Sequence, residues 1–288
     1  MDKRKYAGVD YLTIKEANDE IISYINSGNP FMAARVGETE LGTIRAYDHP
    51  LSSVRDFRIY SNNICINAGF FPKNVLYIKR FCEQYKTAIN DIDLFGAFHW
   101  KSEEDYLMVD NCLKYCFPAS VFDITYDDVS WYSALKDKRV LVVNPFSTTI
   151  EEQYQKKDHI FLINKKINLP DFKLITYKSV QSIGGQGATG FKTWFDALNK
   201  MKEDIGSMDF DIALLGCGAY GVPLAAYIKG LGKQAIYVGG CLQLFFGIIG
   251  KRWENVDRVN RFFNDYWTRP SEKEKTDSYY KVEDGCYW

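Results

Sequence analysis

An arginine, a glycine and two glutamates follow a short apolar run in FMAARVGETELGTIR, residues 31–45. Two carboxylates separated by one residue, Glu38 and Glu40, can share a divalent cation that in turn carries phosphate oxygens. The planar guanidinium of Arg35 can clamp a phosphate through parallel hydrogen bonds. The alternative is structural: both glutamates favour the N-terminus of a following helix, and Arg35 pairs with one of them. The segment therefore indicates either a site for a cation and a phosphate or a charged helix start.

A glycine pattern near residue 218 has the spacing of a phosphate-binding loop. Gly216, Gly218 and Gly221 form G-x-G-x-x-G directly after an apolar strand pattern and directly before a helical one. Such glycines permit a tight turn, close approach of the backbone to a phosphate and close seating of the helix on the sheet. The helix N-terminus then presents N–H groups to an anion. The loop either faces the phosphates of a nucleotide or only makes a strand-to-helix turn.

A nicotinamide dinucleotide site needs a further residue that this sequence lacks. An acidic residue that binds the ribose is expected about 20 residues after the glycines, at the end of the next strand. Tyr237-Val238-Gly239-Gly240 stands there, and no acid lies between Asp211 and Glu254. We therefore expect no NAD, and an NAD(P)-dependent oxidoreductase is kept only as an alternative.

Two further segments are candidates for a ligand site. Asn67 and Gly69 precede a helical pattern and either orient a hydroxyl or phosphate of a ligand or make a turn. The glycine-rich segment 182–190 either drapes over a ligand or is a mobile loop.

A general base has two candidates, His99 and Asp123, each at the end of an apolar run. A lone histidine is more often structural than catalytic. His49 and His159 lie in polar loops and are weaker candidates.

Helical and strand patterns alternate along most of the chain. Thr13 and Glu16 form a capping box that opens an amphipathic helix to about Ile25. Ser147 with Thr148 is expected to cap another helix. Further helices are predicted from Pro72 to about residue 89 and over 189–202 and 222–229. Strands are predicted over 31–36, 94–98, 119–122, 139–143, 174–177, 212–215 and 235–238.

This alternation predicts an α/β fold: a mostly parallel, Rossmann-like sheet with helices on both faces. We expect a single α/β domain, the one that binds the ligand, over residues 1–254. Residues 255–288 form a charged and aromatic C-terminal extension that is expected to pack back onto the body, because disordered tails are poor in aromatic residues.

Charge, cysteine count and hydropathy limit the class of protein. A net charge of -1 with scattered basic residues argues against nucleic acid as a partner. Seven cysteines without a CxxC pair indicate free thiols in a reducing compartment. No apolar run has the length of a membrane span or a signal peptide. We therefore expect a cytoplasmic protein.

RVGETEL, the glycine segment and its continuation GGCLQLFFGIIGKRW together resemble the bacterial GT-D-type glycosyltransferase domain, over residues from about Thr13 to Trp288. That family carries an Arg-X-Gly-Asp-X-Glu motif after an early strand. Arg35 and Gly37 match it, Glu38 stands in place of the aspartate, and Glu40 is the motif glutamate. The replacement lengthens one carboxylate arm by a methylene, which puts metal binding in the family manner in doubt.

The resemblance implies an enzyme that moves a hexose-type sugar from a nucleoside-diphosphate donor to a hydroxyl on a glycan, glycoprotein or lipid-linked acceptor, in bacterial surface-glycan or glycoprotein assembly. It makes Glu38 and Glu40 the catalytic residues and the ligands of a divalent metal, Mn²⁺ or Mg²⁺. A non-catalytic nucleotide-sugar-binding or scaffold protein of the same fold is the other alternative, favoured by Glu38 in place of aspartate. The residues expected to bind the donor are Arg35, Gly37, Asn67, Gly69, Gly216, Gly218, Tyr220 and Gly221.

Overall fold

The computed structural model describes residues 4–48, 54–101, 103–108, 111–164 and 166–288. Within these residues, strands form a single sheet in the order β1-β2-β5-β4-β3-β9-β8-β6-β7. The first two strands are antiparallel and all other neighbours are parallel, which confirms the predicted α/β class. The strands are β1 (Lys5–Tyr6), β2 (Val9–Tyr11), β3 (Phe31–Ala34), β4 (Leu94–Ala97), β5 (Tyr115–Pro118), β6 (Arg139–Asn144), β7 (Lys173–Lys178), β8 (Ile212–Leu215) and β9 (Gln234–Tyr237).

The central strands are buried on both faces because each face is covered by its own layer. In β3, Met32 and Ala34 belong to one apolar cluster, whereas Phe31 and Ala33 belong to the other. This period-2 division of side chains is what a strand imposes. It explains why such strands read as continuous apolar runs rather than as alternating ones.

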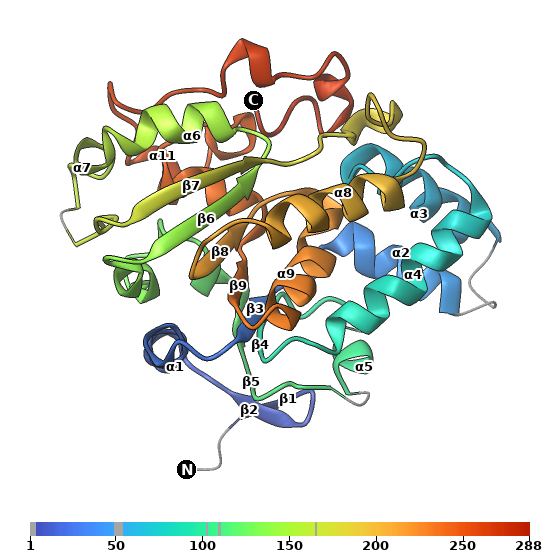
Figure 1. Ribbon diagram of the computed structural model, residues 1–288, viewed down its shortest axis with the longest axis horizontal. Coiled ribbons are helices and arrows are strands. Elements are labelled where there is room, and N and C mark those ends of the chain that lie inside the picture. The colour runs from blue at the N-terminus through green and yellow to red at the C-terminus, as the bar shows by residue number, and fades with distance from the viewer. Residues whose placement is uncertain (1–3, 49–53, 102, 109–110, 165) are drawn as a thin grey trace.

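Helices cover both faces of the sheet, as predicted, and α8 and α9 lie in front of it in Figure 1. The first layer contains α2 (Glu38–Asp48), α3 (Val54–Asn67), α4 (Val75–Ile89), α5 (Glu103–Leu107), α8 (Trp194–Gly206) and α9 (Gly221–Gly230). The opposite layer contains α1 (Ile14–Ser27), α6 (Ser147–Tyr154), α7 (Lys157–Ile160), α10 (Leu242–Phe245) and α11 (Asp257–Asn260).

Local sequence signals set several element boundaries. The predicted capping box at Thr13 and Glu16 is present, and Gly28, with φ +70°, ends α1. Helix α8 begins at Trp194, five residues later than predicted, because Thr193 and Asp196 form a second capping box.

Two predictions of local structure are wrong. Residues 119–122 form a buried 3-10 turn, and the strand β5 immediately precedes them. A short apolar run that is buried in either state carries no period that separates the two. The predicted cap of α6 by Ser147 is also wrong: the carboxylate of Glu274 accepts the N–H of Thr148 at 2.8 Å instead.

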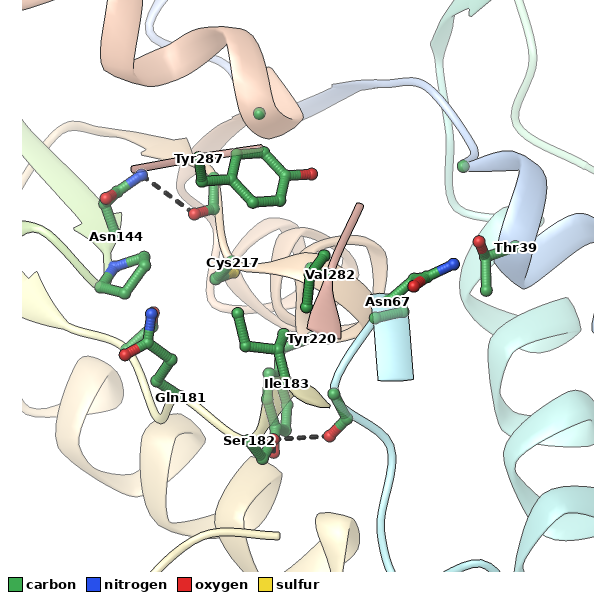
Figure 2. A pocket seen from close by; sticks show the side chains of 18 of the residues that line it. Thr39, Asn67, Asn144, Gln181, Ser182, Ile183, Cys217, Tyr220, Val282 and Tyr287 are labelled. Atoms are coloured by element: carbon green, nitrogen blue, oxygen red, sulfur yellow. Dashed lines mark hydrogen bonds between the residues drawn. The ribbon is translucent and has the colours of Figure 1, made fainter. Parts of the chain in front are cut away.

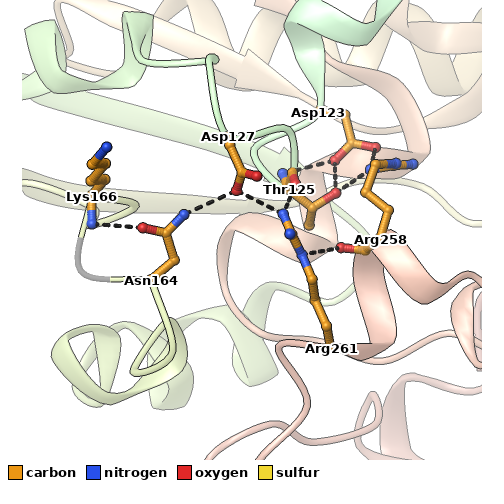
Figure 3. A network of polar contacts seen from close by, with 7 residues as sticks. All are labelled: Asp123, Thr125, Asp127, Asn164, Lys166, Arg258 and Arg261. Carbon is orange, nitrogen blue, oxygen red and sulfur yellow. Dashed lines mark hydrogen bonds and ion pairs between the residues drawn. The ribbon is translucent and has the colours of Figure 1, made fainter.

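The chain beyond residue 254 packs on the opposite layer. Val282 and Trp288 are buried, with 1% and 7% of their surface exposed. Arg258 donates to the carboxylate of Asp123 at 2.7 Å, and Arg261 pairs with Asp127 (Figure 3). These contacts fasten the extension to the segment that follows β5 and bring its last residues over the edge of the sheet.

Candidate functional site

The chain opens a crevice at the carboxyl ends of the parallel strands. The connections that follow β3 and β8 lead to α2 and α9 on one face of the sheet. Those that follow β9 and β6 lead to α10 and α6 on the other face. Where neighbouring connections leave to opposite faces, nothing fills the space above the strand ends, and ligands collect there in open α/β sheets.

A cavity of about 270 Å³ occupies this crevice. Its volume is close to the lower end of the range for small-molecule sites, about 300–1,000 Å³. In Figure 2, Asn144 and Gln181 lie on one side of it and Asn67 and Thr39 on the other, with Tyr287 between them. Of the residues predicted to form the site, those that line the cavity are Arg35, Gly37, Glu38, Glu40, Asn67, Gly69, Gly216, Gly218 and Tyr220.

Arg35 follows β3 directly and places its guanidinium in this cavity. Its Nε donates to the carbonyl of Val238 at 3.3 Å, and the guanidinium lies 5.2 Å from the Phe98 ring centre and 5.7 Å from that of Tyr237. Gly239, with φ +76°, leaves the space that the guanidinium occupies, since a Cβ there would overlap it. Among the described residues Arg35 forms no ion pair, so the predicted pairing with a glutamate is wrong. Glu38 and Glu40 do lie in the first turn of α2, as the structural alternative predicts.

Glu40 is a buried carboxylate, with 5% of its surface exposed, in the first turn of α2. Its side chain folds back over Gly37, where a Cβ would overlap the carboxylate. Burial raises the pKa of the Glu40 carboxyl and the Glu38 charge raises it further, whereas its own backbone N–H and the Arg35 guanidinium act in the opposite direction. A positive charge brought into the cavity would therefore stabilise the ionised form.

Glu38 is exposed and weakly held, since within the described parts of the chain its carboxylate accepts a hydrogen bond only from the Tyr60 hydroxyl, at 3.4 Å. Within the described part of the chain, no group of three or more His, Cys, Asp or Glu side chains could hold a metal ion. Two carboxylates fit a Mg²⁺ or Mn²⁺ ion that arrives with phosphate oxygens, because such ions are held by one or two carboxylates plus substrate phosphates. They do not fit an ion held by the protein alone.

The glycine turn after β8 lies against the Asn67–Gly69 turn. The N–H of Ala219 donates to the Ala68 carbonyl at 3.1 Å, and Gly218, with φ +58°, adopts a conformation that side chains rarely allow. The Ser182 hydroxyl joins both turns, because it donates to the Gly69 carbonyl at 2.5 Å and lies 3.0 Å from the Tyr220 hydroxyl. Three segments far apart in the sequence therefore form one braced wall.

Gly221 differs from the other predicted residues because it does not line the cavity. A Cβ at this position would overlap the ring of Tyr237. The glycine therefore seats α9 on β9, which is the packing role of the last glycine in such a loop.

Several cavity residues were not predicted. Arg252 pairs with Glu283 at 2.5 Å and lies 4.4 Å from the ring centre of Tyr287, and all three line the cavity. Asn144, at the end of β6, donates to the Gly216 carbonyl at 3.0 Å. The position of Asn144 at a strand end was a usable signal, whereas Glu283 and Tyr287 reach the cavity only through the path of the extension.

The predicted general bases do not line this cavity. His99 is hydrogen-bonded to the Tyr11 hydroxyl at 2.9 Å and lines a neighbouring depression. Asp123 is buried in the ion pair with Arg258 (Figure 3). His159 stacks on Tyr266, and His49 lies outside the described residues.

No helix in the described residues has the length and apolar character needed to cross a membrane. No family model and no curated protein matches the chain. Two solved structures are similar to it over 93% of both chains, with TM-scores of 0.47 and 0.48 and sequence identities of 11% and 10%. They are described as "Selenomethionine substituted structure of domain of unknown function 1792 (DUF1792)" and "The highly conserved domain of unknown function 1792 has a distinct glycosyltransferase fold". At this TM-score and identity the likeness does not carry a function to this chain.

Proposed function

We propose that this protein is a glycosyltransferase that moves a hexose-type sugar from a nucleoside-diphosphate donor to a hydroxyl acceptor. The observation that carries the proposal is the meeting of Arg35, Glu40 and the turn at Gly216–Gly218 in one cavity at the carboxyl ends of the strands. The terminal nitrogens of Arg35 form no hydrogen bond with the residues that the structure describes, and the adjacent turn exposes its backbone at Gly218. Both features match the needs of a diphosphate.

The chemistry requires stabilisation of the leaving group. When the sugar leaves, negative charge grows on the diphosphate, and fixed positive groups at that position lower the barrier. Arg35 and Arg252, which both line the cavity, are the protein cations available for this. A Mn²⁺ or Mg²⁺ ion, when bound by Glu38 and Glu40, would supply further positive charge at the same phosphates.

The setting that we propose is the cytoplasmic assembly of a bacterial surface glycan or glycoprotein, with a glycan, glycoprotein or lipid-linked acceptor. All seven cysteines are free, which supports a reducing compartment.

Isothermal titration calorimetry with a panel of UDP-, GDP- and TDP-hexoses, with and without Mn²⁺, tests the proposal. We expect at least one donor to bind, and Arg35→Ala to weaken it about tenfold or more, since a lost charged hydrogen bond costs about 1.5–3 kcal/mol. Arg58→Ala is the matched control, because Arg58 is exposed on α3 and does not line the cavity. No heat with any donor under either condition would contradict the proposal.

The same titration discriminates the alternatives. NAD and NADP belong in the panel, and binding of either in place of a sugar nucleotide would favour an oxidoreductase. For a non-catalytic scaffold, Glu38→Gln and Glu40→Gln should leave partner binding intact, and the parent should show no turnover with any donor that it binds.

A further inference from the structure

A second depression opens beside the cavity and shares two residues with it. One wall is the first turns of α2, with Glu38 and Arg45, and the other is the segment 98–101 that follows β4. The depression is shallow and has a volume of about 410 Å³. Glu38 and Trp100 line both spaces, so the two meet at these side chains.

The aromatic segment of this depression is held in place by a buried carboxylate. Glu103, 2% exposed, accepts the N–H groups of Phe98 at 3.3 Å and His99 at 2.8 Å and the Tyr6 hydroxyl at 2.7 Å. His99 has a left-handed φ of +60°, and its ring packs edge-on against the Tyr6 ring, with the two ring centres 4.8 Å apart. A strained residue persists only where its surroundings determine it, and such residues gather at ligand sites.

This fixed segment holds aromatic surface in solvent at the mouth of the cavity. Phe98 is 41% exposed, and its ring lies 5.3 Å from that of Trp100, edge to face. The face of a sugar ring that carries C–H groups is apolar and packs on aromatic rings such as these, whereas the sugar hydroxyls need polar partners around them.

The charges in the depression are mainly positive. Arg45 donates to the Tyr60 hydroxyl at 2.8 Å and to the Lys101 carbonyl at 3.2 Å, and forms no ion pair among the described residues. Lys101 is exposed on the opposite wall. Among the described residues that line the depression, Glu38 has the one carboxylate and faces two cations, so an anionic group on the ligand is favoured.

We propose that this depression is the acceptor subsite, and that it takes a pyranose bearing a carboxylate or phosphate group. The inference rests on the transferase function proposed above, because it supplies the second substrate of that reaction. An acceptor sugar on Phe98 and Trp100 would present a hydroxyl at the junction with the cavity, next to Glu38.

Saturation-transfer NMR with methyl glucuronide, glucose 1-phosphate and methyl glucoside tests the subsite without a donor. We expect the two anionic sugars to bind better than the neutral one. Phe98→Leu should weaken all three fivefold or more, whereas Arg45→Gln should remove the preference for the anionic sugars. Tyr266→Ala is the matched control, since Tyr266 is 39% exposed and lines neither space.

Binding of none of the sugars by the parent, or equal binding by the parent and both variants, would overturn the inference. Thermal melts of each variant separate loss of the subsite from loss of the fold. Diphosphate binding measured on the parent keeps the two proposals apart. Donor binding without sugar binding would contradict only the proposed acceptor subsite. Sugar binding without donor binding would contradict the proposed transferase function and leave a sugar-binding site.

Discussion

Substitution of Gly239 tests whether Arg35 is the anion-binding group. An alanine Cβ at this position would overlap the Arg35 guanidinium, so Gly239→Ala should displace that side chain from the cavity. The residue also has φ +76°, and a non-glycine residue there costs about 1–2 kcal/mol of stability from the backbone alone. The backbone cost has to be separated from the displacement.

Gly232→Ala provides that separation. Gly232 has nearly the same backbone angle, φ +78°, but nothing lies within 4 Å of a Cβ built there. Both variants should therefore lose a similar amount of stability in urea unfolding, whereas only Gly239→Ala should lose ligand affinity. A lost hydrogen bond to a charged group is worth about 1.5–3 kcal/mol, or roughly a 10- to 150-fold rise in Kd.

Calorimetry with pyrophosphate and with UDP, GDP and TDP measures the difference without knowledge of the donor base. Equal affinities of the two variants for every one of these ligands would refute the role of Arg35, however much stability each had lost.

Three further substitutions test individual side chains. Glu40→Gln should raise the melting temperature at neutral pH, because burial holds the folded-state pKa of this carboxyl above its unfolded value. The parent therefore loses stability as the pH rises from the unfolded pKa through the folded pKa. At acid pH the carboxyl is protonated in both states, so the gain from the substitution should vanish there. Thermal melts across pH check the sign. Glu283→Gln should lower the Kd for pyrophosphate by up to about fivefold, because the carboxylate of residue 283 no longer competes with the ligand for Arg252. The half-exposed ion pair that is lost is worth about 0.2–1 kcal/mol. An unchanged Kd would show that the pair does not compete. Gly221→Ala should lower the free energy of unfolding in urea by about 1–3 kcal/mol, because the added Cβ overlaps the Tyr237 ring. The folded variant should bind pyrophosphate with the parent's Kd. A large loss of affinity would place this glycine at the ligand.

The elements that the sequence predicted well are those with strong local signals. Helix α1 has both a capping box and a glycine stop, and β8 is an apolar run bounded by polar residues and glycine. The alternation of helices and strands predicts the class of fold but not the order of the strands in the sheet. Which parallel strands become neighbours is decided by packing across the whole chain. The helix α3 was not predicted at all, although it covers Val54–Asn67.

The candidate site was predictable where its residues follow strands directly. Arg35 and Gly216 stand one residue after β3 and β8, and the carboxyl ends of parallel strands share one edge of the sheet. Arg252 and Glu283 were not predictable, because they come from a segment of short turns that crosses this edge only in the folded chain. The position of Gly221 outside the cavity lining has a related cause: the glycine pattern does not say which glycine faces a ligand and which one faces a ring.

A structure of the protein with a bound nucleoside diphosphate and Mn²⁺ is the most direct measurement of the central claim. The account predicts phosphate density within hydrogen-bonding distance of the Arg35 guanidinium and beside the turn at Gly216–Gly218. Phosphates bound at any other part of the molecule, or an empty cavity at ligand concentrations that saturate binding in solution, would contradict it.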